Sequence, residues 1–116
     1  LAEAQLAKID AVLDRLRLRS GSRLLEIGCG WGSLAARAVD RHDAIVHALT
    51  LSEEQARVAG ARLTALDPGG RSRVSLTDYR DASGQFDAIA SVEMVEAVGR
   101  DYWPGYLDQI AALLRP

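Results

Sequence analysis

LLEIGCGWGS, residues 24–33, is a short apolar run that contains one acid and continues into three glycines at every second position. An apolar run bounded by glycines predicts a buried strand, and the apolar-periodic stretch from Leu34 predicts a helix. The glycines therefore lie in a tight turn between a strand and a helix. Glycine suits such a turn because it adopts positive φ angles and lets a ligand approach the main-chain amides. Because the helix N-terminus behind the turn presents free N–H groups with partial positive charge, we expect the turn to bind a ligand.

The glycine spacing indicates which ligand the turn accepts. The dinucleotide fingerprint G-x-G-x-x-G would place its third glycine at position 33, where this chain has Ser33, and the glycine stands at Gly32 instead. Glu26, an anion at the mouth of the turn, suits the ammonium of a methionine moiety better than a pyrophosphate. S-adenosylmethionine, a sulfonium with an amino-acid tail and no phosphate, fits both features. A plain turn, with Glu26 satisfied by neighbouring amides, remains an alternative. A nicotinamide cofactor is disfavoured, also because Thr50 stands where many nucleotide-binding folds place an acid for the ribose hydroxyls.

Composition places the chain among globular domains. Its 116 residues, 48% hydrophobic and 26% charged, predict one domain over residues 1–116. The net charge of −2, with both signs interleaved, gives no indication of nucleic-acid binding. The single cysteine, Cys29, cannot form an internal disulfide, which fits a cytoplasmic location, and we expect it to be a small buried thiol. The histidines, His42 and His47, have no partners at metal-ligand spacing, so no metal is predicted.

Apolar periodicity predicts alternating helices and strands along the chain. The expected helices cover residues 2–18, 34–43 and 52–66, and a last one begins near Pro104 and turns Leu107, Ile110, Ala111 and Leu114 inward. The expected strands are 23–27, 44–50, 73–77 and 86–92, and a loop or short helix over 93–99 leaves the last of them. The alternation predicts a doubly wound, mostly parallel, Rossmann-like α/β sheet. Its second strand is apolar enough to be buried on both faces.

Four loops form the candidate site, because ligands of such sheets bind outside the carboxyl ends of the strands. These loops are residues 26–33, 50–55, 78–80 and 93–99. In the second loop, Ser52-Glu53-Glu54-Gln55 is a capping box, with Ser52 as the cap and Gln55 reaching back to it. The chain begins at Leu1 and stops where a helix is closing at Pro116, which predicts a piece of a longer chain that is truncated after the fourth strand and its following helix.

Read together, the four loops resemble one family. The stretches LEIGCGWG (25–32), LTLSEEQ (49–55), DYRD (78–81) and SVEMVEAVG (91–99) resemble the cyclopropane-fatty-acyl-phospholipid synthases and the mycolic acid cyclopropane synthases, which are S-adenosylmethionine-dependent methyltransferases. The match covers nearly the whole chain beyond residue 18. The resemblance implies transfer of a methyl group from S-adenosylmethionine to the double bond of an unsaturated phospholipid acyl chain, after which a proton is lost to close a cyclopropane or leave a methyl branch.

The resemblance also implies roles for individual residues. The three glycines Gly28, Gly30 and Gly32 would line the cofactor, and Thr50 and Gln55 would contact it. In the same loops, Glu26, Trp31 and Leu51 are further predicted cofactor-binding residues. Tyr79 would lie beside the adenine, with Asp78 next to it. Glu96 would be the catalytic residue, as part of the site of a bicarbonate ion that serves as the base.

Several of these residues also have structural interpretations. Trp31 either caps the sheet or faces the sulfonium, and the capping box alone explains Gln55. Asp78 either holds the adenine amino group or ends the third strand. Glu96 could be a helix-dipole partner only.

The chain departs from the family at Ala97, where a histidine is common after the acid, and the other bicarbonate-site residues would lie outside residues 1–116. The parent protein would contact the membrane peripherally, at its inner face, to reach a lipid substrate. The alternatives are a methyltransferase acting on a small soluble substrate and a cofactor-binding fragment without activity. The sequence does not indicate an oligomeric state.

Overall fold

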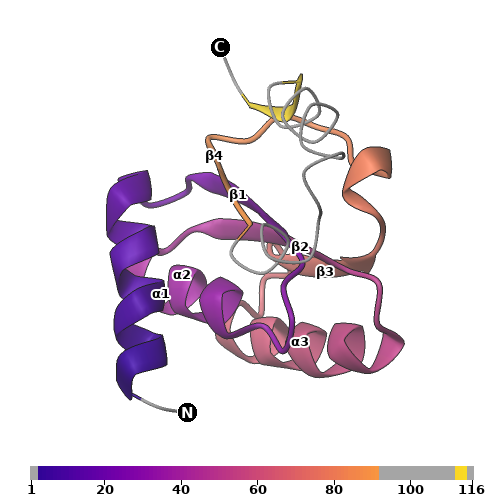
Figure 1. The fold of residues 1–116 in the computed structure, drawn as a ribbon, viewed down its shortest axis with the longest axis horizontal. Helices are drawn as coiled ribbons and strands as arrows, with labels where there is room; N and C mark the ends of the chain where they lie inside the picture. Colours follow the sequence, from indigo (N-terminus) through magenta and orange to yellow (C-terminus); the bar gives the residue numbers. More distant parts are fainter. Residues whose placement is uncertain (1–2, 92–111, 115–116) are drawn as a thin grey trace.

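A parallel four-stranded sheet forms the centre of the computed structural model, which describes residues 3–91 and 112–114 (Figure 1). Its strands are β1 (Arg23–Ile27), β2 (Ile45–Thr50), β3 (Arg73–Leu76) and β4 (Ala88–Ala90). The helices are α1 (Glu3–Leu16), α2 (Ser33–His42) and α3 (Glu53–Leu66), with a short 3-10 helix η1 (Tyr79–Asp81). The strand order β3-β2-β1-β4 means that the chain winds outward from β1 in one direction and then returns to its other side. The doubly wound parallel sheet predicted from the sequence is therefore confirmed.

Alternate residues of β1, β2 and β4 pack in two different cores, as the period of two in a strand requires. Even-numbered β-strand residues such as Leu24, Val46 and Ala90 pack with residues of α1, α2 and α3. Figure 1 shows α2 and α3 together against this face of the sheet. On the other face, Leu25, Ile27 and Leu49 form a smaller cluster, which also contains the buried residues Tyr79, Phe86 and Leu113.

The expected elements match the observed ones within a few residues, except at the end of the described chain. The fourth strand is three residues long, and Phe86 instead makes an isolated parallel bridge with Leu114. Leu114, expected to face inward, is 36% exposed, and Leu113 is buried in its place, because the chain at this bridge no longer follows the helical period. The loop 93–99, with Glu96, and the start of the last helix lie outside the described residues.

The second strand departs from its expected burial. Ala48, Leu49 and Thr50 at its carboxyl end are buried, whereas Ile45 and His47 near its start are half-buried. The prediction that β2 is covered on both faces is therefore wrong for its amino half. The reason lies in its neighbours, because His47 is paired with the polar residue Arg73 of β3 rather than with an apolar one.

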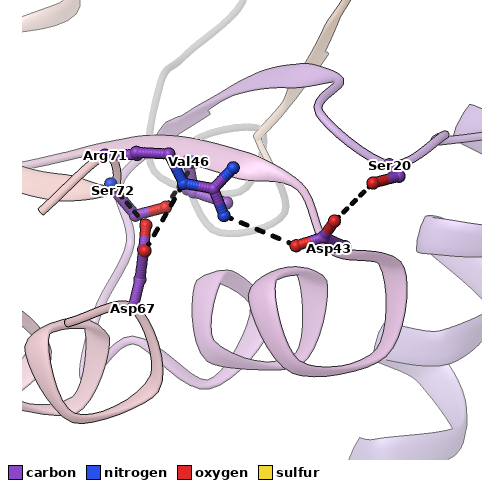
Figure 2. A network of polar contacts seen from close by, with 6 residues as sticks. All are labelled: Ser20, Asp43, Val46, Asp67, Arg71 and Ser72. Carbon is purple, nitrogen blue, oxygen red and sulfur yellow. Dashed lines mark hydrogen bonds and ion pairs between the residues drawn. The ribbon is translucent and has the colours of Figure 1, made fainter. Parts of the chain in front are cut away.

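A polar network fixes the amino ends of the strands (Figure 2). Asp67, which ends α3, accepts a hydrogen bond from the main-chain N–H of Ser72 at 2.9 Å, and the Ser72 hydroxyl accepts one from the N–H of Val46 at 2.9 Å. Arg71 pairs with Asp67 at 3.5 Å and with Asp43 at 3.4 Å. Asp43 also accepts a hydrogen bond from Ser20. The connections that lead into β1, β2 and β3 are thus joined to one another.

No helix in the described part of the chain is long and apolar enough to cross a membrane.

Candidate functional site

The glycine-rich turn has the backbone that the sequence predicts. Gly28, Gly30 and Gly32 have φ angles of +74°, +55° and +90°, in the left-handed region that favours glycine. The N–H groups of Gly28 and Cys29 both donate to the main-chain oxygen of Leu49, at 3.0 and 2.8 Å. The turn is therefore attached to the carboxyl end of β2, and α2 begins directly after it.

Gly32 also has a packing role that its position in the motif does not reveal. A Cβ added to Gly32 would lie 2.8 Å from the Cβ of Ala59 and 3.1 Å from its Cα, so the close approach of α2 to α3 leaves no room for a side chain. Arg62 of α3 donates to the main-chain oxygen of Trp31 at 3.1 Å and to the Ser33 hydroxyl at 3.3 Å. Contacts from α3 therefore hold the turn on one side.

A pocket of about 360 Å³ opens at the carboxyl ends of β1, β2 and β3. Six of the ten predicted cofactor-binding residues line it, from three of the four predicted loops: Gly28, Thr50, Leu51, Gln55, Asp78 and Tyr79. Four other lining residues were not predicted, namely Ile27, Leu49, Ser52 and Thr77. Ile27 lies in the predicted loop 26–33 and Leu49 in the predicted second strand, but neither was predicted to contact the cofactor. Their odd positions near the ends of β1 and β2 direct them to the face of the sheet on which the pocket lies.

The other four predicted residues lie next to this pocket and do not line it. Glu26 is 3% exposed, and its register neighbours Ala48 and Ala90 are core residues on the α1–α3 face of the sheet. Its carboxylate is therefore buried and does not stand at an open mouth. Trp31 is 49% exposed and belongs to neither core cluster of the described residues. Gly30 and Gly32 complete the turn behind the pocket. Cofactor binding by these four residues stays a prediction.

Hydrogen bonds among Thr50, Ser52 and Gln55 shape one wall of the pocket. The Ser52 hydroxyl accepts a hydrogen bond from the N–H of Gln55 at 3.2 Å, so Ser52 caps α3 as predicted. The described structure lacks the second hydrogen bond of a capping box, from the N–H of Ser52 to the Gln55 side chain. The N–H of Ser52 instead donates to the Thr50 hydroxyl at 3.1 Å, and this hydroxyl donates to the Gln55 side chain at 3.0 Å. Thr50, which is 5% exposed, therefore orients the Gln55 amide.

Asp78 and Tyr79 line the pocket from the loop after β3. Asp78 begins η1 by accepting a hydrogen bond from the N–H of Arg80 at 2.9 Å, and its two carboxylate oxygens pair with the Arg80 guanidinium at 3.1 and 2.8 Å. The hydrogen bond from the Arg80 side chain holds the pKa of Asp78 below its usual value, so the carboxylate stays charged. Tyr79 is buried, and the Arg80 guanidinium lies 5.9 Å from the centre of its ring.

Within the described ranges, the structure has no group of three or more His, Cys, Asp or Glu side chains that could hold a metal ion. The lining of the pocket combines apolar side chains, an amide, hydroxyls and one carboxylate. Such a lining suits an uncharged heterocycle and its sugar hydroxyls, and it has no cation for a phosphate.

Comparison with known proteins gives one consistent result. The sequence profile of the mycolic acid cyclopropane synthetase family matches residues 1–116. The chain is 48% identical over its full length to tuberculostearic acid methyltransferase of Mycobacterium tuberculosis and 40% identical to cyclopropane-fatty-acyl-phospholipid synthase of Escherichia coli. It spans 27% and 29% of the lengths of these two relatives.

The solved structure of a mycolic acid cyclopropane synthase in complex with SAH and CTAB superposes on this chain with a TM-score of 0.87. The two sequences are 38% identical, and the match covers 97% of this chain and 40% of that protein. The family resemblance that the four loops predict is thereby confirmed. The chain belongs to the mycolic acid cyclopropane synthetase family.

Proposed function

We propose that this chain forms the S-adenosylmethionine-binding part of an enzyme that transfers a methyl group to the double bond of an unsaturated acyl chain of a phospholipid, giving a cyclopropane or a methyl branch. One observation carries the proposal: the pocket at the carboxyl edge, beside the glycine turn, gathers predicted cofactor residues from three separate loops. The comparisons support it, because one structural neighbour is in complex with SAH and one relative is named as a synthase acting on fatty acyl phospholipids.

The residues of the pocket fit an adenosyl group. Ile27, Leu49 and Tyr79 supply apolar and aromatic surface for a flat heterocycle, and the Asp78 carboxylate can accept a hydrogen bond from its amino group. Gly28, with its positive φ and no side chain, lets the sugar approach the main chain of the turn.

We assign different roles to Thr50 and Gln55 at the sugar: Gln55 binds it and Thr50 orients Gln55. Because the Thr50 hydroxyl donates to Oε1 of Gln55, the Gln55 amide is held with its nitrogen on the other side. Within the described residues no hydrogen bond occupies that nitrogen, so its two N–H groups can donate to the ribose hydroxyls. The Thr50 hydroxyl donates one hydrogen bond and accepts another inside the protein, and we therefore assign it the role of a positioning residue.

S-adenosylmethionine, when bound, supplies an electrophilic methyl group. An alkene is a weak nucleophile, so the protein must align the double bond with the methyl group and stabilise the cation that follows. We assign Glu96, which lies outside the described residues, to the site of a bicarbonate ion that removes the proton. Because the substrate lies in a bilayer, we further propose that the whole protein acts peripherally at the cytoplasmic face of the membrane.

Calorimetry tests the cofactor. The chain should bind S-adenosylhomocysteine and should not bind NAD, and Gln55→Leu should weaken the affinity about tenfold, the usual loss for one or two hydrogen bonds. Thr50→Val should weaken it as well, because the amide loses its orientation. Thr64→Val makes the same change on the exposed side of α3 and serves as the matched control. Binding of NAD in place of S-adenosylhomocysteine would refute the proposed cofactor, and equal effects of Thr50→Val and Thr64→Val would refute the role of Thr50.

Methyl transfer tests the substrate. The whole protein, given radiolabelled S-adenosylmethionine, should label vesicles of unsaturated phospholipid and leave saturated vesicles unlabelled. Glu96→Gln should suppress turnover and leave the cofactor affinity within a few-fold. A protein that binds the cofactor and labels neither lipid would contradict the proposed substrate. A large loss of affinity in Glu96→Gln would place Glu96 in the cofactor pocket instead.

A further inference from the structure

A second pocket, of about 350 Å³, lies at the opposite ends of the same strands. Arg23, the first residue of β1, and Arg73, the first residue of β3, line it, together with His47, Arg71, Gly70 and Phe86. This pocket is far more basic than the chain as a whole, whose net charge is −2. Nothing in the proposed methyl transfer uses it.

The sheet register places three of these side chains on one face. His47 is the register partner of both Leu25 and Arg73, and Arg23 is two residues before Leu25, so all four residues share the face opposite α1–α3. In the described structure, the apolar cluster on this face includes Leu25, Ile27 and Leu49 of the strands and extends to the amino end through Phe86, which lines the pocket. At the amino half, cationic side chains occupy the positions at which a fully covered strand would carry apolar residues.

The arginines differ in how far their charge is already balanced. Arg71 pairs with Asp43 and Asp67. Arg23 has its guanidinium 5.2 Å from the centre of the Phe86 ring. No ion pair joins Arg23 or Arg73 to a carboxylate in the parts of the chain that the structure covers. The Asp87 carboxylate accepts a hydrogen bond from the main-chain N–H of Arg23 at 2.8 Å. Both guanidinium groups therefore contribute positive charge to the pocket without an ion pair of their own among the described residues.

His47 adds an uncharged polar group between these cations. Its Nε2 lies 2.8 Å from the Ser75 hydroxyl. Burial, followed by the charges of Arg73 and Arg23, lowers the pKa of His47 to about 4, so the ring is neutral at pH 7. The smaller part of this lowering comes from the positive charges of Arg73 and Arg23, which would attract an anion.

We propose that this pocket binds a phosphate-bearing anion. The planar guanidinium of arginine matches the oxygens of a phosphate, and two such groups with a neutral imidazole between them provide several hydrogen bonds to one anion. The volume lies in the lower range of small-molecule pockets, which suits a phosphate with a small attached group. That phosphate could belong to a free metabolite or to a lipid headgroup, and the two sources can be distinguished by experiment.

The first arm titrates inorganic phosphate into the whole protein at constant ionic strength and follows the ring resonances of His47 by NMR. We expect saturable binding, at least about tenfold weaker in the double variant Arg23→Gln/Arg73→Gln. The matched control, Arg15→Gln/Arg57→Gln, removes the same charge from exposed positions of α1 and α3 and should bind phosphate as the unchanged protein does. If the double variant does not fold, Arg73→Gln alone, which changes an exposed side chain of β3, should still weaken binding.

The second arm measures sedimentation with vesicles of phosphatidylglycerol or of phosphatidylcholine. Binding to phosphatidylglycerol that is lost in Arg23→Gln/Arg73→Gln, without saturable binding of inorganic phosphate, would support the pocket and assign its ligand to a lipid headgroup. Saturable phosphate binding without vesicle binding would assign it to a free phosphate. The proposal is overturned if neither arm shows binding, or if the control variant loses as much affinity as the pocket variant.

Discussion

Replacing Gly32 with alanine should destabilise the chain by about 2–5 kcal/mol. Two costs add in this estimate. A non-glycine residue at φ +90° pays about 1–2 kcal/mol in backbone strain. The new methyl group would lie 2.8 Å from the Cβ of Ala59 and 3.1 Å from its Cα, and overpacking of that kind costs about 1–3 kcal/mol. Because a domain of this size is stable by only about 5–15 kcal/mol, the loss is easily measured.

Two other glycines separate the two costs. Gly21 has φ +82° and nothing within 4 Å of its missing Cβ, so Gly21→Ala should cost the strain alone, about 1–2 kcal/mol. Gly60 lies inside α3 with open space and an ordinary φ, so Gly60→Ala should stabilise the chain by about 0.5–1 kcal/mol. The double variant Gly32→Ala/Ala59→Gly removes the methyl group that the new Cβ meets. It should be less destabilised than the sum of the two single changes.

Urea denaturation followed by circular dichroism gives the free energy of unfolding of each variant. The expected order of stability is Gly60→Ala, then the unchanged chain, then Gly21→Ala, then Gly32→Ala. The packing argument is refuted if the free energies of unfolding of Gly32→Ala and Gly21→Ala agree within about 0.5 kcal/mol, or if the double variant shows no coupling. Either result would mean that the contact between α2 and α3 does not exclude a side chain at residue 32.

Three further changes test other parts of the structure. The pKa of His47 is lowered from 6.5 to about 4. Between these pH values the folded chain therefore binds fewer protons than the unfolded chain, and the free energy of unfolding should fall as the pH is lowered from 6.5 to 4. The expected fall is about 1–2 kcal/mol, a value reduced because His47 is only half-buried. His47→Gln should flatten this pH dependence and His42→Gln should not, in denaturation at several pH values. Asp67→Ala should cost about 1–3 kcal/mol by leaving the buried N–H of Ser72 unsatisfied, and Asp67→Asn, which keeps an acceptor, should cost less in the same assay. Asp10→Asn removes a two-point pair with Arg37 of α2, and the resulting loss of melting temperature should shrink as salt is added.

The sequence predicts the order and type of the elements well because each has a strong local signal. The apolar stretch that ends at Gly28 gives β1 with its observed bounds, and Ser52 marks the start of α3. The alternation of strands and helices then leaves few topologies, and it places the candidate loops at one edge of the sheet. The weakest prediction is the fourth strand, whose expected first two residues take part in contacts that no local pattern specifies. Phe86 bridges to a residue 28 positions later, and Asp87 accepts a hydrogen bond from the N–H of Arg23.

Within the site, the sequence identifies residues more readily than it identifies their partners. The capping-box pattern correctly gives the Ser52 cap, but it cannot show that the Gln55 side chain prefers the Thr50 hydroxyl. That preference depends on the position at which β2 ends relative to α3. The three glycines of the turn look equivalent in the sequence. In the structure, Gly28 lines the pocket, whereas Gly32 is so close to Ala59 that it has no room for a side chain. Roles of this kind arise from contacts between elements and are not encoded by spacing along the chain.

The two pockets have a common structural origin. In a parallel sheet, residues with the same register share a face along the whole length of the strands, so the face opposite α1–α3 runs from Arg23 and His47 at one end to Ile27 and Leu49 at the other. Leu25 lies between these ends, in one apolar cluster with Phe86 and Leu113, and Phe86 also lines the amino-end pocket. The carboxyl end has loops that bring hydroxyl, amide and carboxylate groups, whereas at the amino end β1 and β3 begin with arginine. We therefore place the proposed cofactor site and the proposed anion site at opposite ends of one face of the sheet, with Leu25 between them.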